Sequence, residues 1–317
     1  MASELDRRMD AAIAALTAPG GQLAVTRIER EGRALPVIAA APPALPHYFA
    51  HFCREHADKT FLVAGAERLT FAEVYAEARR VAAALVEGVG IARGERVGIA
   101  MRNSPAWIAL YMGVTMAGGI ATLLNGWWAP EELAAAVREV ECRLVFADAP
   151  RAERLAGAGC DVIAIDDRVA LAEALAPVTR RGGSADTVLP QLGGEDDATI
   201  LFTSGSTGQS KGALSDHRAV LQATFNFLAQ ALVMLGIATE NGTPPKGQPA
   251  TLLNVPLFHV TAEVPVLLQS FAMGRKLVLM PKWDAEEAMR LIEAEDVTYF
   301  VGVPLMSYEM LTHPNRH

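Results

Sequence analysis

The stretch Ala-Thr-Ile-Leu-Phe-Thr-Ser-Gly-Ser-Thr-Gly-Gln-Ser-Lys-Gly, residues 198–212, decides how this chain is interpreted. Its first five residues are apolar or β-branched and predict a buried strand. The next ten, residues 203–212, combine glycines, hydroxyl side chains and one lysine. Glycines let a backbone turn tightly so that successive N–H groups point at one anion, and hydroxyls and a lysine add donors and positive charge. The composition predicts a triphosphate-binding loop.

The phosphate-binding candidates are Thr203, Ser204, Gly205, Ser206, Thr207, Gly208, Lys211 and Gly212. The order of these residues matters, because the kinase-type pattern G-x-x-x-x-G-K-[ST] places the lysine directly after a glycine. Here Lys211 follows Ser210 and precedes Gly212. An unrelated P-loop phosphotransferase therefore stays open only as a disfavoured alternative. A flexible Ser/Gly linker is disfavoured too, because a buried strand precedes the segment and a long helix, expected at 216–235, follows it.

The segment 203–212 resembles the phosphate-binding signature of the adenylate-forming superfamily, which contains acyl-CoA synthetases, luciferases and the adenylation domains of peptide synthetases. That signature is Thr-Ser-Gly-[Ser/Thr]-Thr-Gly-x-Pro-Lys-Gly, and this chain departs from it once, with Ser210 in place of the proline. Residues 214–218 are similar to the Ser/Thr-His-Arg opening of the family's next helix. Further similar stretches lie at 68–87, 94–105 and 117–133. Only the first forty-odd residues lack a clear counterpart.

A second motif, Val-Pro-Leu-Phe-His-Val-Thr-Ala, occupies residues 255–262. A lone histidine among apolar residues is usually a packed core residue. This stretch, however, is similar to the family's Pro-Leu-Phe-His motif, whose histidine lines the acyl pocket. The resemblance implies a substrate-side role for His259, with Phe258 and Val260 forming the pocket wall. Gly302 precedes a Val-Pro helix start that resembles the family's and borders the same pocket, although a proline in the first helical turn explains that start equally well.

The same motif favours a class of substrate. Amino-acid-activating relatives tend to carry Phe-Asp-x-Ser here, and their pocket supplies an aspartate for the amino group. No aspartate lies beside Phe258 in this sequence. The resemblance therefore implies a fatty or aryl carboxylic acid without an amino group.

The resemblance also implies a two-step reaction. A carboxylate attacks the α-phosphorus of Mg-ATP and expels pyrophosphate, and a thiol, coenzyme A in the acyl-CoA synthetase branch, then displaces AMP. His259 and Lys211 are the expected catalytic residues, and Thr203 is the candidate contact to Mg²⁺. The expected cofactors are ATP, Mg²⁺ and coenzyme A.

The family's sequences continue beyond the part that this chain matches. They add an adenine-binding strand, a metal-binding glutamate and a small mobile domain with a catalytic lysine. We therefore expect the N-terminal portion of an AMP-forming acyl-CoA synthetase, which makes no acyl-CoA by itself. A non-catalytic acyl- or nucleotide-binding relative of the same fold stays open as the alternative.

The organisation of the chain predicts an α/β fold with two packed subdomains, each with a largely parallel sheet flanked by helices, as in the large N-terminal domain of that family. Ala-rich helical stretches alternate with short, uniformly apolar runs, which is typical of buried parallel strands. Residues 1–46 are expected to form a helix and strap, 47–190 a first α/β subdomain, and 191–317 a second one that carries the phosphate-binding loop. The polar, Gly-rich stretch 177–197 places the boundary.

Composition excludes some classes of protein. The formal net charge of −8 argues against a nucleic-acid partner. Three cysteines far apart suggest neither a disulfide framework nor a zinc site, and the cytoplasm is the expected compartment. The uncharged stretch 104–130 divides into a short helix and a strand, so no membrane span is expected. We leave open a homodimer.

Overall fold

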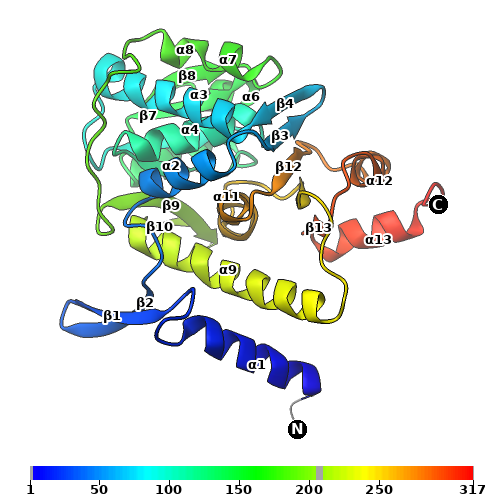
Figure 1. Cartoon of the computed structure of the whole chain (residues 1–317). Coiled ribbons are helices and arrows are strands. Elements are labelled where there is room, and N and C mark those ends of the chain that lie inside the picture. Colours follow the sequence, from blue (N-terminus) through cyan, green and yellow to red (C-terminus); the bar gives the residue numbers. More distant parts are fainter. Residues whose placement is uncertain (1–2, 205–209, 317) are drawn as a thin grey trace.

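The computed structural model describes residues 3–204 and 210–316, and it places two large mixed β-sheets among helices (Figure 1). One sheet has six strands in the order β10-β9-β6-β5-β7-β8, and the other has five in the order β13-β11-β12-β3-β4. A separate two-stranded hairpin, β1–β2, lies near the N-terminus. The predicted α/β class, with largely parallel sheets flanked by helices, is confirmed.

The six-stranded sheet consists of β5 (Arg96–Ala100), β6 (Ile120–Leu123), β7 (Leu144–Asp148), β8 (Asp161–Ile165), β9 (Asp197–Ser204) and β10 (Ser210–Asp216). All neighbouring strands are parallel except β10, which runs antiparallel to β9. Every residue of β6 and β7 is buried. Burial on both faces explains the uninterrupted apolar sequence of these strands.

The five-stranded sheet consists of β3 (Thr60–Ala64), β4 (Glu67–Thr70), β11 (Ala250–Leu253), β12 (Lys276–Leu279) and β13 (Tyr299–Phe300). Its strands are parallel except β4, which forms a hairpin with β3. In both sheets the carboxyl ends of the parallel strands therefore share one edge. Ligands of open α/β sheets bind outside that edge.

Capping residues mark the starts of two helices. Thr70 and Glu73 form a capping box at the start of α3, and the Ser104 side chain caps α4, which has Pro105 as its first residue. The helical segments after the N-terminal region, with η denoting π-helix, are α2 (Leu45–Glu55), α3 (Phe71–Ala83), η1 (Ala84–Val89), α4 (Pro105–Met116), α5 (Pro130–Glu139), α6 (Ala149–Arg154), α7 (Leu171–Ala174), α8 (Ala176–Thr179), α9 (His217–Glu240), α10 (Val260–Ala262), η2 (Glu263–Leu268), α11 (Gln269–Met273), α12 (Ala285–Ala294) and α13 (Pro304–Thr312).

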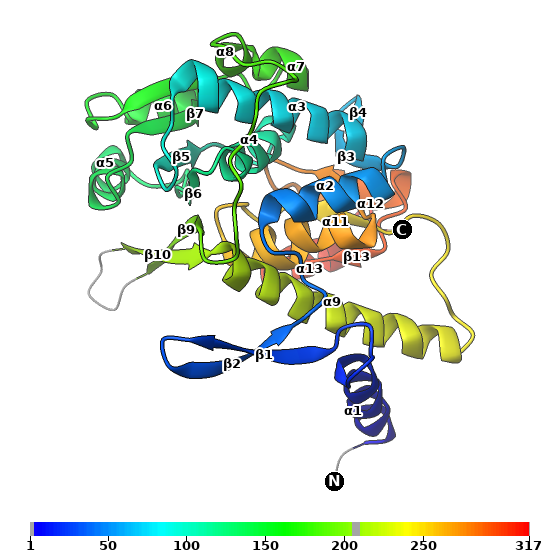
Figure 2. The same ribbon diagram turned by 60° about the vertical axis from the view of Figure 1, so that its left-hand side comes forward.

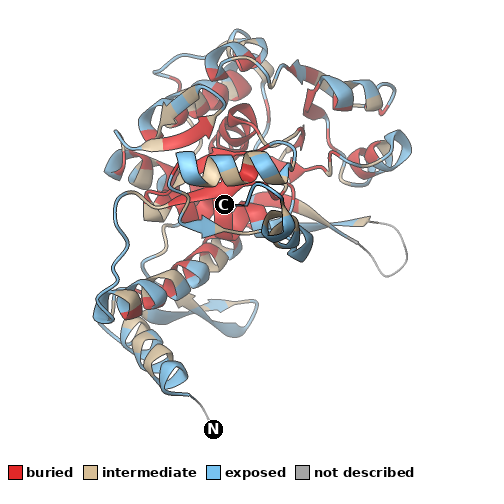
Figure 3. Cartoon of the chain, turned by 90° about the vertical axis from the view of Figure 1, so that its right-hand side faces the viewer, coloured by how far each residue is buried: buried red, intermediate tan, exposed pale blue. Residues whose placement is uncertain are grey.

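The two sheets do not follow the division of the chain expected at residue 190. β9 and β10 complete the sheet built from earlier strands, while β3 and β4 join the sheet built from later ones. One contiguous apolar cluster includes Leu62 of β3, Val97 of β5 and Leu253 of β11, together with most of α4. The two sheets thus share a core across α4, and Figure 3 shows buried residues gathered in the middle of the molecule.

The N-terminal region is attached to the long helix α9. It consists of α1 (Glu4–Thr17), β1 (Val25–Arg30) and β2 (Arg33–Ile38), and Figures 1 and 2 show it on the side of α9 opposite the two sheets. Arg8 pairs with Glu240 at one end of α9, and Arg30 pairs with Asp216 at the other. This region is a helix followed by a hairpin, where the sequence predicts a helix and strap.

α9 is also the one helix of the described residues that is long and apolar enough to cross a membrane by length and composition. Core helices of globular proteins pass the same test. Val220, Leu221 and Phe225 of α9 are buried in this structure, within the cluster that joins the sheets. The uncharged stretch 104–130 forms α4 and β6, both short, as its glycine and proline positions predict.

One local prediction differs from the structure. Residues 210–212 were expected to belong to the phosphate-binding loop, but they begin β10, because Gly212, Leu214 and their neighbours pair along β9. Of the cysteines, Cys53 and Cys142 are buried, and burial raises the pKa of each thiol to about 12. The third cysteine, Cys160, is half-buried.

Candidate active site

A pocket of about 710 Å³ opens beyond the carboxyl ends of strands from both sheets. Its wall is formed by the segments that follow β5, β6, β11, β12 and β13, together with one residue of α6. The lining residues are Met101, Arg102, Asn103, Trp127, Arg151, Asn254, Val255, Pro256, Phe258, His259, Thr261, Pro281, Lys282, Trp283, Val301, Gly302, Val303, Pro304 and Met306. A mostly apolar pocket of this size with a few polar groups suits a small organic ligand.

Three of the four predicted substrate residues line this pocket. Phe258 is buried in the wall, His259 lies at the start of α10, and Gly302 lies after β13. Val260 does not line the pocket, and its side chain is 55% exposed. The expected role of Val260, the first residue of α10, in the pocket wall therefore stays a prediction.

His259 is held by backbone hydrogen bonds, and its ring lies against the Phe258 ring with centroids 4.7 Å apart. Its N–H donates to Pro256 O over 3.0 Å, and its carbonyl accepts from the N–H groups of Ala262 and Glu263. The imidazole is exposed, yet the pocket wall removes part of its water and lowers its pKa. A neutral imidazole at the pocket rim can accept or donate a hydrogen bond to a carboxylic acid.

Trp127, which the sequence interpretation did not select, is one of the aromatic residues that line the pocket. Its ring meets the Phe258 ring edge to face, with centroids 5.3 Å apart, and lies 6.5 Å from the His259 ring. Its neighbour Trp128 packs edge to face against Phe202 of β9 at 5.1 Å. The Trp-Trp pair thus contacts both the pocket and the strand that leads into the predicted phosphate loop. The rare sequence Gly-Trp-Trp was the available signal.

Asn103 connects the two sheets at the base of the pocket. Its side-chain amide donates to Val255 O over 2.8 Å and accepts from the Leu257 N–H over 2.9 Å. One side chain that follows β5 therefore fixes the backbone that follows β11. The Phe258-His259 segment consequently has a defined position relative to the six-stranded sheet.

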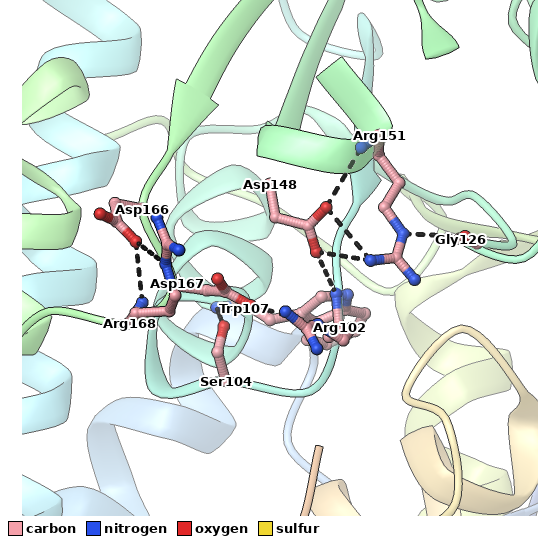
Figure 4. Close-up of polar contacts among 9 residues, drawn as sticks. All are labelled: Arg102, Ser104, Trp107, Gly126, Asp148, Arg151, Asp166, Asp167 and Arg168. Atoms are coloured by element: carbon pink, nitrogen blue, oxygen red, sulfur yellow. Dashed lines mark hydrogen bonds and ion pairs between the residues drawn. The ribbon is translucent and has the colours of Figure 1, made fainter. Parts of the chain in front are cut away.

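A buried ion pair supports the turn that carries Trp127 (Figure 4). Asp148, at the end of β7, is fully buried and accepts from Arg151 Nη1 over 3.1 Å and from the Arg102 N–H over 2.9 Å. Arg151 Nε in turn donates to Gly126 O over 2.8 Å. Arg154 donates to Gly126 O as well. Two arginines thus fix the turn before Trp127 through the carbonyl oxygen of Gly126.

The predicted phosphate-binding residues are only partly within the described chain. Gly205, Ser206, Thr207 and Gly208 lie outside the described residues. Lys211 and Gly212 are in β10, where Lys211 pairs directly with Thr203 and Gly212 with Phe202. Thr203 and Lys211 are both exposed. Directly opposite residues point to the same face of a sheet, so a hydroxyl and an ammonium group lie side by side.

Lys211 and His259, the two predicted catalytic residues, do not share a pocket in this structure. None of the described residues between 203 and 212 lines the pocket that contains His259. The reason is the antiparallel pairing of β10 with β9, which carries Lys211 along the outer edge of the six-stranded sheet. Trp128 and Phe202 provide the contact between the two regions.

The structure thus has an open α/β core, a pocket at the carboxyl ends of its strands, and Thr203 paired with Lys211 in the β9–β10 hairpin. The family model of AMP-binding enzymes matches residues 49–317, and the chain belongs to that family. The match leaves out the first 48 residues, in agreement with the absence of a counterpart for the N-terminal region.

Several relatives are acyl- or aryl-CoA ligases. The chain is 30% identical over 246 residues to the long-chain-fatty-acid–CoA ligase FadD13 of Mycobacterium tuberculosis, covering 75% of this chain and 44% of that protein. It is 26% identical over 267 residues to 4-coumarate–CoA ligase 3 of Arabidopsis thaliana, covering 81% and 45%. The chain therefore spans less than half the length of these relatives.

Solved structures support the same fold. The inhibitor-bound N-terminal domain of FACL13 from Mycobacterium tuberculosis matches 87% of this chain and 66% of its own, with a TM-score of 0.73 and 27% identity. The fatty acyl CoA synthetase of Mycobacterium tuberculosis matches with a TM-score of 0.70 and 26% identity, over 86% of this chain and 51% of its own. The architecture is that of the N-terminal domain of adenylate-forming enzymes.

Proposed function

We propose that this chain carries the ATP- and acid-binding region of an AMP-forming acyl-CoA synthetase that acts on a fatty or aryl carboxylic acid. The observation that carries the proposal is the aromatic pocket at the carboxyl ends of both sheets, with Phe258, His259 and Trp127 in its wall. Its apolar wall suits an alkyl or aryl group. The exposed imidazole of His259 is the group that would orient the carboxylate.

The residues present fit a nucleoside triphosphate. Thr203 and Lys211 lie directly opposite each other on an exposed face at the base of the predicted loop, which suits an anion. When bound, ATP supplies the pyrophosphate leaving group. Lys211 would neutralise phosphate charge, and the pocket wall would exclude water from the carboxyl group of the acid.

Magnesium would fit this arrangement bound mainly to the phosphates of the nucleotide. The described residues contain no group of three or more His, Cys, Asp or Glu side chains that could hold a metal ion. Mg²⁺ bound to nucleotide phosphates keeps several waters and needs few protein ligands. The Thr203 hydroxyl would supply one. Coenzyme A, the acceptor in the names of the relatives, is the proposed second substrate.

Binding measurements on the 317-residue chain test the proposal directly. Calorimetric titration with Mg-ATP and with a non-hydrolysable acyl-sulfamoyl adenosine should show binding of both. Lys211→Met should weaken Mg-ATP binding, and Phe258→Ala should weaken the acyl analogue more than Mg-ATP. Lys246→Met, a charge change in an exposed loop, serves as the matched control and should alter neither affinity. Equal affinities in all four proteins would contradict the proposal.

The alternative function is that of a non-catalytic acyl- or nucleotide-binding relative. It is favoured by the separation of Lys211 from the pocket that contains His259. Acid-dependent exchange of pyrophosphate into ATP distinguishes the two functions, since only an adenylating enzyme supports it. AMP as the nucleotide product would also exclude a phosphotransferase, which forms ADP.

A further inference from the structure

The N-terminal hairpin β1–β2 forms a sheet of its own outside the family-matched residues 49–317. Its two-residue turn, Glu31-Gly32, has φ values of 50° and 72°, as a tight type I′ turn requires. Among the described residues, neither strand pairs with a third strand. Two strands alone are marginally stable in water, and unpaired strand edges are templates for pairing with another chain.

The outer edge of β2 is blocked. Pro36 lies directly opposite Arg27. Because proline has no N–H, this pair belongs to the non-hydrogen-bonded class, and the polar backbone groups of both residues point away from the hairpin. At the outer edge of β2, Pro36 therefore offers no donor. The outward groups of Ile38 are occupied by the Gln222 side chain, which accepts from Ile38 N–H over 2.7 Å and donates to Ile38 O over 3.1 Å.

Among the described residues, no strand pairs with the outer edge of β1. The alternation set by the Arg27–Pro36 pair turns the backbone groups of Val25, Arg27 and Glu29 outward, away from β2. These three residues are exposed. The side chains of the intervening Ile28 and Arg30 are half-buried toward the body of the protein, where Arg30 pairs with Asp216. The hairpin is therefore anchored by one face and has one open edge.

We propose that the open edge of β1 pairs antiparallel with the same edge of a second copy of this chain, with Ile28 on the two-fold axis. In this register Arg27 lies directly opposite Glu29 of the second copy, and Glu29 opposite Arg27, so two oppositely charged pairs form by symmetry. Opposite charges in such positions are favourable and like charges unfavourable. The result is a continuous four-stranded sheet across the dimer.

Charge selects this register over its neighbours. The outward backbone groups occur at every second residue of β1. Moving the symmetry axis by one residue shifts the pairing by two residues, so the neighbouring registers with intact hydrogen bonds have the axis on residue 27 or on residue 29. An axis on residue 27 puts Arg27 opposite Arg27 of the second copy, and an axis on residue 29 puts Glu29 opposite Glu29. Both place like charges together. Only the axis on Ile28 pairs opposite charges on both sides.

A charge-exchange experiment on the full chain tests the interface. Sedimentation over a wide range of protein concentrations should show a monomer–dimer equilibrium for the unchanged protein. Arg27→Glu and Glu29→Arg each create two like-charge pairs, so each should raise the dimer dissociation constant about tenfold or more. The double variant Arg27→Glu/Glu29→Arg restores opposite charges and should restore the dimer. Arg138→Glu, an exposed change of equal charge on α5, should leave the equilibrium unchanged.

Disulfide trapping tests the register independently. Ile28→Cys brings two thiols together at the axis, in a non-hydrogen-bonded pair close enough for a disulfide, so oxidation should give a covalent dimer. Thr26→Cys lies off the axis and should not. The unchanged protein, which has the half-buried Cys160 besides the buried Cys53 and Cys142, gives the background.

The results decide clearly. A protein that stays monomeric at all concentrations overturns the proposal. A dimer that the charge exchange does not affect, or one in which Ile28→Cys fails to cross-link, is built on another surface and overturns it too. Circular dichroism and urea unfolding of each variant should match those of the unchanged protein, since Arg27 and Glu29 are exposed.

Discussion

The indole of Trp127 lies edge to face against the phenyl ring of Phe258, with ring planes at 89° and centroids 5.3 Å apart. Trp127 follows a strand of the six-stranded sheet, and Phe258 follows a strand of the five-stranded one. Phe258 is buried, whereas Trp127 remains 65% exposed. One side of the pocket is therefore formed by a contact between a buried residue and a largely exposed one.

Removing this contact should change ligand binding more than folding. Trp127→Ala uncovers Phe258 and loses an aromatic pair of about 1 kcal/mol, so affinity for an acyl-sulfamoyl adenosine should fall several-fold. Trp127→Phe should retain part of it. Titration calorimetry measures the affinity, and Trp128→Phe is the control, because Trp128 packs on Phe202 outside the pocket. Unchanged affinity in Trp127→Ala would exclude Trp127 from the acyl site.

The bridge made by Asn103 should couple pocket geometry to stability. Asn103→Ala leaves Val255 O and the Leu257 N–H without their partner, which should lower the free energy of unfolding by about 1–3 kcal/mol. The same change frees the Phe258-His259 segment, so the affinity for the acyl analogue should fall as well. Urea unfolding and calorimetry measure the two effects. Loss of stability without loss of affinity would show that the bridge does not position the pocket.

Asp148 should be the most sensitive residue of the polar network. It is fully buried, and Asp148→Asn leaves the Arg151 guanidinium without its counter-charge. Breaking a buried ion pair in this way costs about 3–5 kcal/mol, which urea unfolding would detect. Asp166→Asn provides the contrast, because the Asp166–Arg168 pair is on the surface. Similar small effects of both substitutions would show that Arg151 finds another partner.

Glu263 should make stability depend on pH. It is fully buried in η2, accepts a 2.8 Å hydrogen bond from the Tyr111 hydroxyl, and burial raises its pKa to about 7. The folded state therefore holds a proton that the unfolded state releases at its ordinary pKa of 4.5. The free energy of unfolding should therefore fall as pH rises from about 4.5 to about 7. Above pH 7 the ionisation of Glu263 should cause no further decrease.

Glu263→Gln tests this dependence, because the amide oxygen can keep the Tyr111 hydrogen bond without a charge. The variant should match the unchanged protein near pH 4.5 and exceed its stability above pH 7 by up to a few kcal/mol, at roughly 1.4 kcal/mol for each unit of pKa shift. Thermal unfolding across this pH range gives the measurement. A stability difference that does not change with pH would show that the carboxyl group is ionised throughout.

Much of the local structure followed from the sequence. The strand at 198–202 and the short helix and strand of the stretch 104–130 form where the residues predict. Periodicity, caps and turn residues act over a few positions, so a sequence displays them directly. The Pro-Leu-Phe-His motif likewise located Phe258 and His259 in the pocket wall.

Contacts between distant residues could not be predicted in this way. Trp127 lies 131 positions before Phe258, and Asn103 lies 152 positions before Val255. Neither pairing has a local pattern, since each depends on how the segments after β5, β6 and β11 come together. The strand β10 was missed for a related reason: its mostly exposed residues become a strand only because β9 offers an edge.

By itself, therefore, the sequence determined the fold class, the family resemblance and the residues of the two motifs. Only the tertiary structure decided which strands share a sheet, that Lys211 lies outside the pocket of His259, and that β1 keeps an open edge. The physical reason is range. Backbone propensity and periodicity act between neighbours in the chain, whereas sheet order and pocket walls result from burying apolar faces that are far apart in the sequence.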